Sequence, residues 1–99
     1  MLGLGAKNPV IILADADLES AVKECLIGTL SFNGQRCTAL KIIFVHRSIA
    51  EAFVERFARG VSALSCGMPW EEGVFITPLP ESGKPQEMKA YLDEAVADG

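Results

Sequence analysis

The apolar residues at the start of the chain follow a strand pattern. Residues 9–14 form a continuous run rich in β-branched side chains, with Asn8 before it and Asp15 after it. A short run of this kind is typical of a parallel strand buried on both faces. We therefore expect a central parallel strand here.

A helical pattern follows this strand. Asp15 or Asp17 can accept the free N–H groups that open a helix, and one face then collects most of the apolar side chains. These are Leu18, Ala21, Val22, Cys25, Leu26, Thr29 and Leu30. The helix is expected to run to about Phe32 and to break at Asn33 and Gly34, because both residues tolerate left-handed backbone conformations.

A second strand and helix pair is predicted next. Residues 41–46 form the strand, and Ser48 and Glu51 have capping-box spacing, in which each side chain satisfies an N–H group at the helix start. A helix of about four turns follows. Its expected apolar stripe is Phe53, Val54, Phe57, Val61 and Leu64.

A long irregular connection rich in Gly and Pro covers residues 67–80, and Ser82, Gly83 and Pro85 then open a third helix that ends at Gly99. Its inward face is expected to be apolar. The residues of that face are Met88, Tyr91, Leu92, Ala95 and Val96.

Strands that alternate with helices, without a hairpin signal, favour parallel pairing through crossover helices. The predicted fold class is therefore α/β, with two strands and three helices as part of a doubly wound parallel sheet. Two strands cannot cover two helical faces, so we expect a piece of a larger layer. A compact miniature of the same elements, marginally stable at this size, is the alternative.

Composition narrows the function. The chain has 99 residues, 49% of them hydrophobic and 22% charged, with a formal net charge of −4. This acidic balance argues against a nucleic-acid partner, and no apolar run reaches the length of a membrane span. Three cysteines without a secretory leader are expected to be reduced thiols in the cytoplasm.

One cysteine has a setting that suits chemistry. Cys37 follows Arg36 in the turn after Gly34, where a cation and backbone N–H groups would stabilise a thiolate, which is the nucleophilic form of the side chain. A small buried hydrophobic role is the alternative. Cys25 lies on the apolar helix face, and burial explains it.

The sequence around Cys37 resembles the aldehyde dehydrogenase superfamily. Gly34-Gln35-Arg36-Cys37 looks like the turn that presents the catalytic cysteine there, residues 8–18 look like the preceding strand and helix start, and residues 41–48 look like the strand after the nucleophile. The branch of NADP-dependent, non-phosphorylating glyceraldehyde-3-phosphate dehydrogenases fits best. Residues 66–70 and 76–81 are similar to its later segments, so the resemblance covers essentially the whole chain.

The resemblance implies a domain organisation. Members of the family are several times longer, with a dinucleotide-binding domain, a catalytic domain and an oligomerisation arm, so residues 1–99 would be the part of the catalytic domain that carries the nucleophile. NADP, or NAD, would bind elsewhere in the complete enzyme, and this chain is expected to bind neither tightly. The implied substrate is a small, phosphorylated aldehyde, and the complete enzyme would be a cytoplasmic homo-oligomer.

The resemblance also implies roles for two residues. In such enzymes the cysteine thiolate adds to the aldehyde, a hydride leaves for NADP, and water hydrolyses the thioester. Cys37 matches this nucleophile, and its own N–H group would help to hold the oxyanion. Arg36 matches a residue that binds the substrate phosphate. Its alternative is a surface salt bridge.

The chain departs from the family at its beginning. The family motif Glu-Leu-Gly-Gly-Lys supplies the carboxylate that activates water, and the matching stretch here places Gly3 at the glutamate position and Ala6 at a glycine position. Loss of a general base is expected to slow deacylation by about a hundredfold to ten-thousandfold. A catalytically silent fragment that at most associates with complete subunits is therefore one alternative. An enzyme that transfers its acyl group to coenzyme A is another.

Other candidate sites are explained more simply by structure. Asp15 and Asp17 are interpreted as helix caps rather than a catalytic pair, His46 as a strand-end side chain, and Trp70 as a packing anchor. No cysteine and histidine spacing indicates zinc. Gly3-Leu4-Gly5 lacks the preceding strand of a dinucleotide loop.

Overall fold

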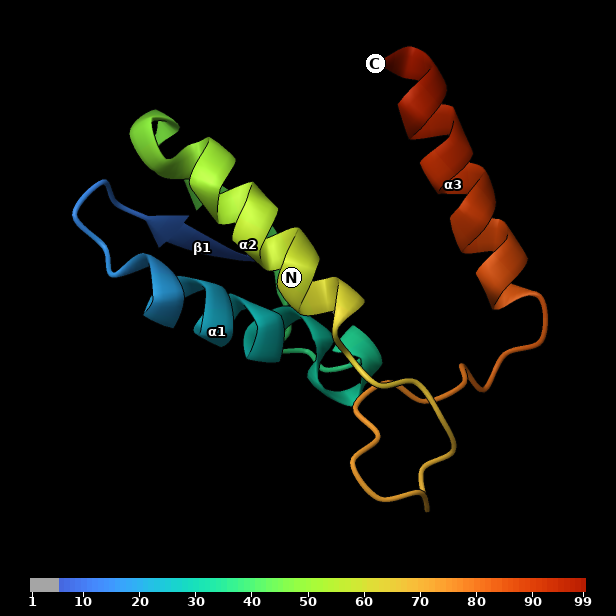
Figure 1. The fold of residues 1–99 in the computed structure, drawn as a ribbon. Coiled ribbons are helices and arrows are strands. Elements are labelled where there is room, and N and C mark those ends of the chain that lie inside the picture. Colours follow the sequence, from blue (N-terminus) through green and yellow to red (C-terminus); the bar gives the residue numbers. More distant parts are fainter. Residues whose placement is uncertain (1–5) are drawn as a thin grey trace, which may run out of the picture.

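The computed structural model describes residues 6–99 and shows an α/β arrangement of two strands and three α-helices (Figure 1). The predicted fold class is confirmed. The elements, in chain order, are β1 (Asn8–Ile12), α1 (Leu18–Leu30), the 3₁₀ helix η1 (Ser31–Gly34), β2 (Leu40–Val45), the 3₁₀ helix η2 (Arg47–Ile49), α2 (Ala50–Ser62) and α3 (Lys84–Asp98).

The two strands pair in parallel, as the alternation of elements predicted. The pairing is regular from Pro9, opposite Ile42, to Ile12, opposite Val45, and irregular between Asn8 and Pro9. Both strands therefore begin at the same end of the sheet, which is where the loop before β2 lies.

A small core joins the sheet to α1 and α2. Ile12 of β1, Val22 and Cys25 of α1, and Phe53 of α2 are buried and form one cluster. The ring of Phe53 stacks on that of Phe57 at a centroid distance of 5.6 Å. Burial of Cys25 confirms that its position on the apolar face of α1 reflects packing.

The opposite face of the sheet is open. The side chains of Ile11, Leu13 and Phe44 are 69%, 61% and 55% exposed. The prediction that the first strand is buried on both faces is therefore wrong for this chain, because two strands and two helices can cover only one side of the sheet. The strand is also shorter than residues 9–14.

Helix α1 begins as predicted and ends early. The Asp17 carboxylate accepts a hydrogen bond of 2.8 Å from the Ser20 N–H, which makes Asp17 the N-cap. The helix stops at Leu30, two residues before the predicted end. Positive φ angles begin already at Phe32 (54°) and continue through Asn33 (56°) and Gly34 (68°).

The predicted capping box of α2 is wrong. The Ser48 N–H donates to the Nδ1 atom of His46 at 3.3 Å, and Ile49 caps α2 without a side-chain hydrogen bond. The 3₁₀ turn η2 therefore replaces the box, and His46 is an exposed strand-end residue, as expected. Val54 is 62% exposed, so it does not belong to the apolar stripe.

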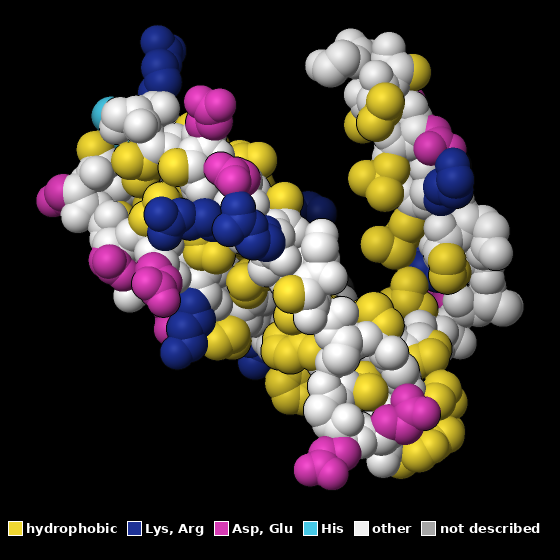
Figure 2. All heavy atoms as spheres, viewed as in Figure 1, with side chains coloured by type: hydrophobic (Ala, Val, Ile, Leu, Met, Phe, Trp, Pro, Cys, Tyr) yellow, Lys and Arg dark blue, Asp and Glu magenta, His cyan; other side chains and the backbone are white. Residues whose placement is uncertain are grey.

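Helix α3 extends away from the rest of the molecule (Figure 1). Hydrophobic side chains gather along its side that faces the other helices (Figure 2), but Tyr91 and Val96 are 62% and 82% exposed. The apolar pattern of this helix was predicted correctly, whereas burial of that face was not. Trp70, in the preceding connection, is 76% exposed, so its predicted role as a packing anchor is also wrong.

Candidate functional site

Cys37 lies in the short loop that connects η1 to β2, and its side chain is exposed. The loop contains a turn in which the Ala39 N–H donates to the carbonyl oxygen of Arg36 at 3.1 Å. Ala39 itself is completely buried. The loop is thus anchored at its end by Ala39, while the thiol of Cys37 faces solvent.

Asn8 holds this loop from the neighbouring strand. Its Nδ2 atom donates to the carbonyl oxygens of Cys37 at 2.6 Å and of Ala39 at 3.1 Å. Sequence reasoning treated Asn8 only as the boundary of a strand. The signal that could have revealed its role is the following proline, because Pro9 has no N–H group to donate to the neighbouring strand.

Asn33 holds the other end of the loop. Its Nδ2 atom donates to the carbonyl oxygen of Thr77 at 2.8 Å and to the Thr77 hydroxyl at 3.0 Å, and its Oδ1 atom accepts from the Thr77 N–H at 3.0 Å. The sequence predicted Asn33 as a helix-breaking residue and did not reveal this contact. The Lys41 ammonium adds a hydrogen bond of 2.7 Å to the carbonyl oxygen of Gly34.

Arg36 is exposed and points back toward the end of α1. Its guanidinium donates to the Ser31 hydroxyl at 2.7 Å and lies 5.1 Å from the centre of the Phe32 ring. Within residues 6–99, the ion pairs do not involve Arg36, so its alternative role as a surface salt bridge is not what the structure shows. The cation is therefore held at the surface, in the same loop as Cys37.

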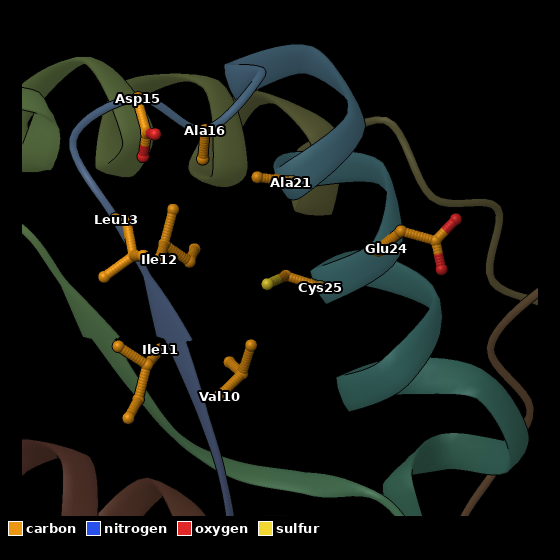
Figure 3. Close-up of a pocket in the computed structure, with 9 residues that line it drawn as sticks. All are labelled: Val10, Ile11, Ile12, Leu13, Asp15, Ala16, Ala21, Glu24 and Cys25. Atoms are coloured by element: carbon orange, nitrogen blue, oxygen red, sulfur yellow. The ribbon is translucent and has the colours of Figure 1, made fainter.

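Cys25 has a different environment. Its sulfur faces an open hollow of about 420 Å³ between β1 and α1, together with Val10 and Ile12 (Figure 3). Burial, with a smaller contribution from Glu24, raises the pKa of the Cys25 thiol. A raised pKa disfavours the thiolate, so the geometry separates a structural cysteine at position 25 from an accessible one at position 37.

The turn between β1 and α1 does not fit a dinucleotide. Phosphate sites in βα units use free N–H groups at the helix start. Here the Asp17 carboxylate already accepts from the Ser20 N–H, and Asp15 adds a second acidic side chain. Asp17 therefore serves as a cap, as predicted, and this turn would repel a pyrophosphate.

The structure describes one of the two positions, Gly3 and Ala6, at which the start of the chain departs from the resembling enzymes. Gly3, and with it the stretch Gly3-Leu4-Gly5, lies outside the described residues, whereas Ala6 is exposed.

Among residues 6–99, the structure shows no cluster of side chains suited to a metal ion. In the same part of the chain, none of the helices has the length and apolar character needed to cross a bilayer.

Comparison with known proteins gives one consistent result. The family model described as "Aldehyde dehydrogenase family" matches residues 1–99. The chain is 40% identical over 99 residues to an NADP-dependent glyceraldehyde-3-phosphate dehydrogenase of Streptococcus equinus, and 36% identical to a succinate-semialdehyde dehydrogenase [NADP(+)] of Mycolicibacterium paratuberculosis. Each match covers 100% of this chain and 21% of the relative, so the chain spans about a fifth of the length of these curated relatives.

Solved structures agree with this result. A succinate-semialdehyde dehydrogenase from Burkholderia pseudomallei is similar with a TM-score of 0.88 and 32% identity over 97% of this chain and 20% of that one. An NADP-dependent glyceraldehyde-3-phosphate dehydrogenase from Bacillus halodurans, complexed with NADP, gives a TM-score of 0.86 and 36% identity over the same shares. The chain is thus similar to dehydrogenases that are named for different substrates, and its fold corresponds to about a fifth of each of these structures.

Proposed function

Because the chain belongs to the aldehyde dehydrogenase family, we propose that residues 1–99 form the part of an oxidoreductase catalytic domain in which Cys37 attacks an aldehyde. The observation that carries this proposal is the placement of Cys37. Its thiol is exposed in a loop that side-chain amides hold at both ends, through Asn8 and Asn33. An accessible thiol on a fixed backbone is what nucleophilic attack at a defined angle requires.

The chemistry assigned to the described residues is the addition step. The Cys37 thiolate forms a carbon–sulfur bond with the aldehyde carbon, and the carbonyl electron pair moves to the oxygen. A backbone N–H fixed in the loop, such as that of Cys37, stabilises the developing oxyanion without reorganising. The resemblance to the family assigns the hydride acceptor, NADP or NAD, to other parts of the complete enzyme, and the acidic βα turn of this chain is compatible with that assignment.

Arg36 is proposed to select a phosphorylated aldehyde. Its guanidinium is exposed one residue from Cys37, and a guanidinium offers paired donors to phosphate oxygens. The bond to the Ser31 hydroxyl and the contact with Phe32 hold its side chain along the loop. The proposed substrate is glyceraldehyde 3-phosphate, oxidised to 3-phosphoglycerate in the cytoplasm by a homo-oligomeric enzyme.

A chimera tests these roles. The matching fifth of the Streptococcus equinus relative is replaced by residues 1–99, and aldehyde oxidation is measured with NADP. The expected result is turnover that Cys37→Ser abolishes and Cys66→Ser leaves unchanged. Turnover that persists in Cys37→Ser would overturn the assignment of the nucleophile. For Arg36→Gln, a rise in KM confined to the phosphorylated substrate is expected; equal effects on an unphosphorylated aldehyde would contradict the phosphate role.

A catalytically silent segment is the second candidate, because Gly3 stands where the resembling enzymes carry their general base. In the chimera, this candidate predicts no formation of NADPH. A burst of NADPH close to one equivalent, followed by slow turnover, would instead indicate that Cys37 is acylated and that only hydrolysis of the thioester is slow. Gly3→Glu should then accelerate the slow phase by about a hundredfold or more. Acceleration by coenzyme A without this substitution would instead support acyl transfer to a thiol.

A further inference from the structure

Asn8 is the residue outside the Cys37 loop that binds this loop most directly. Both hydrogens of its amide point at main-chain oxygens, one on Cys37 and one on Ala39. Because both partners are carbonyl oxygens, only the nitrogen of the amide can face them. The side chain thus bridges two peptide groups that follow the nucleophile, Cys37–Thr38 and Ala39–Leu40.

The strand pairing explains why a side chain has this task. The regular ladder between β1 and β2 starts at Pro9, and the register shifts between Asn8 and Pro9. Proline cannot donate a main-chain hydrogen bond, so the backbone of β1 cannot continue the ladder toward Cys37 in the usual way. The Asn8 amide supplies two donors at the place where the ladder stops.

The loop has few other restraints near the thiol. Arg36, Cys37 and Thr38 are all exposed, and buried packing resumes only at Ala39. Exposed segments with few packed side chains open locally at low free-energy cost. Two hydrogen bonds from a half-buried amide are therefore a large share of what holds the main chain of the nucleophile.

We propose that Asn8 is a positioning residue for Cys37, which holds the carbonyl groups of Cys37 and Ala39 so that the thiol keeps one direction of attack. This inference rests on the proposed function, since it assigns Asn8 a part in the same reaction. Asn8 does not touch the sulfur; it acts through the backbone of the loop.

The test is the rate of alkylation of Cys37 by iodoacetamide across a range of pH, measured in the full chain by peptide mass. Asn8→Asp is nearly isosteric but places a carboxylate oxygen against both carbonyl oxygens, and Asn8→Ala removes both donors. In each variant the alkylation rate of Cys37 is expected to change by about tenfold and its pH profile to shift, as loss of both hydrogen bonds would produce. Cys66 is also exposed, so its alkylation rate in the same samples serves as an internal reference.

Ile11→Ala is the matched control, because Ile11 lies on the same strand as Asn8 and its side chain is 69% exposed on the open face of the sheet. It should leave the profile of Cys37 unchanged. If Asn8→Asp does not fold, as judged by circular dichroism, the alkylation profile of Cys37 in Asn8→Ala alone tests the proposal. Profiles of Cys37 within twofold of the wild type in folded variants would overturn the proposal, and so would parallel changes at Cys37 and Cys66.

The same data separate this inference from the proposed function. The ratio of Cys37 to Cys66 rates in the wild type reports whether Cys37 is an activated nucleophile. The ratio of variant to wild-type rates at Cys37 reports whether Asn8 positions it. A ratio near one in the first comparison would count against the proposed function, whereas only the second comparison bears on Asn8.

Discussion

The side-chain amide of Asn33 and the main chain of Thr77 bind each other in both directions, although they lie 44 residues apart in the sequence. Asn33 donates to the carbonyl oxygen of Thr77 and accepts from its N–H group. The contact attaches the irregular connection after α2 to the turn that precedes the Cys37 loop. It also holds Asn33 at a φ of 56°, a conformation that costs most residues free energy.

Two substitutions at Asn33 should separate the hydrogen bonds from the backbone strain. Asn33→Gly removes the bonds but keeps the positive φ accessible, and it should lower the free energy of unfolding by about 1–3 kcal/mol. Asn33→Ala adds the strain of a left-handed alanine and should cost about 1 kcal/mol more. Urea denaturation measures both. Equal stability of the two variants would contradict the assignment of strain.

Gly34 is required for a different reason. Its φ is 68°, and a Cβ atom would lie 2.7 Å from the carbonyl oxygen of Thr29. Gly34→Ala therefore combines strain with a clash against the backbone and should destabilise the chain by about 2–4 kcal/mol. Gly73→Ala is the control, because Gly73 has a φ of 77° but open space around its Cα. It should cost about 1 kcal/mol; an equal loss at both sites would show that the clash is not the cause.

Phe53 should be the most sensitive position of α2. Its side chain is 3% exposed and packs in the core cluster, so Phe53→Ala should lower the free energy of unfolding by about 3–5 kcal/mol. Val54→Ala, next to it on the exposed side of the same helix, should change stability by less than about 0.5 kcal/mol. Thermal unfolding followed by circular dichroism distinguishes the two. Similar losses would mean that Val54 is also packed in solution.

Asp17 should make the stability of the fold depend on pH. Hydrogen bonds from Ser20 lower the pKa of the Asp17 carboxyl in the folded chain. A lowered folded pKa means that the carboxylate stabilises the fold at neutral pH and that this contribution is lost as the pH falls through that pKa. The stability difference between wild type and Asp17→Ala should therefore shrink on acidification.

Chemical denaturation at a series of pH values between about 3 and 7 measures this effect, over the range in which an aspartate titrates. Asp15→Ala serves as the control for removing one negative charge from the same turn. A difference between wild type and Asp17→Ala that stays constant over this range would show that the cap acts without its charge.

Local patterns predicted the elements of this chain well. The Asp17 cap, the buried side of α1 and the parallel pairing all follow from residues close in sequence, and each is confirmed. Local prediction failed before α2, where the side chains of His46 and Glu51 are both close enough in sequence to accept the N–H group of Ser48. Ser48 has the spacing of a capping box, but its N–H bonds instead to His46, which closes a 3₁₀ turn first.

The candidate site was predicted only in part. Chemical character singled out Cys37 and Arg36, since a thiol beside a cation in a turn is visible in the sequence. The residues that hold the loop were not, because Asn8 and Asn33 bind partners 29 and 44 residues away. A side chain that binds a distant main-chain atom leaves no periodic trace in the sequence.

By itself, therefore, the sequence determined the helices and strands, the family, and the choice of Cys37 as the candidate nucleophile. These depend on residue type and on short spacings along the chain. Tertiary structure decided which apolar faces are covered and how the Cys37 loop is held. Helices α1 and α2 cover one side of the sheet, whereas Phe44 on its other side and the apolar face of α3 are exposed. The physical reason is that burial and long-range hydrogen bonds depend on which segments meet in space, and local preference does not specify this.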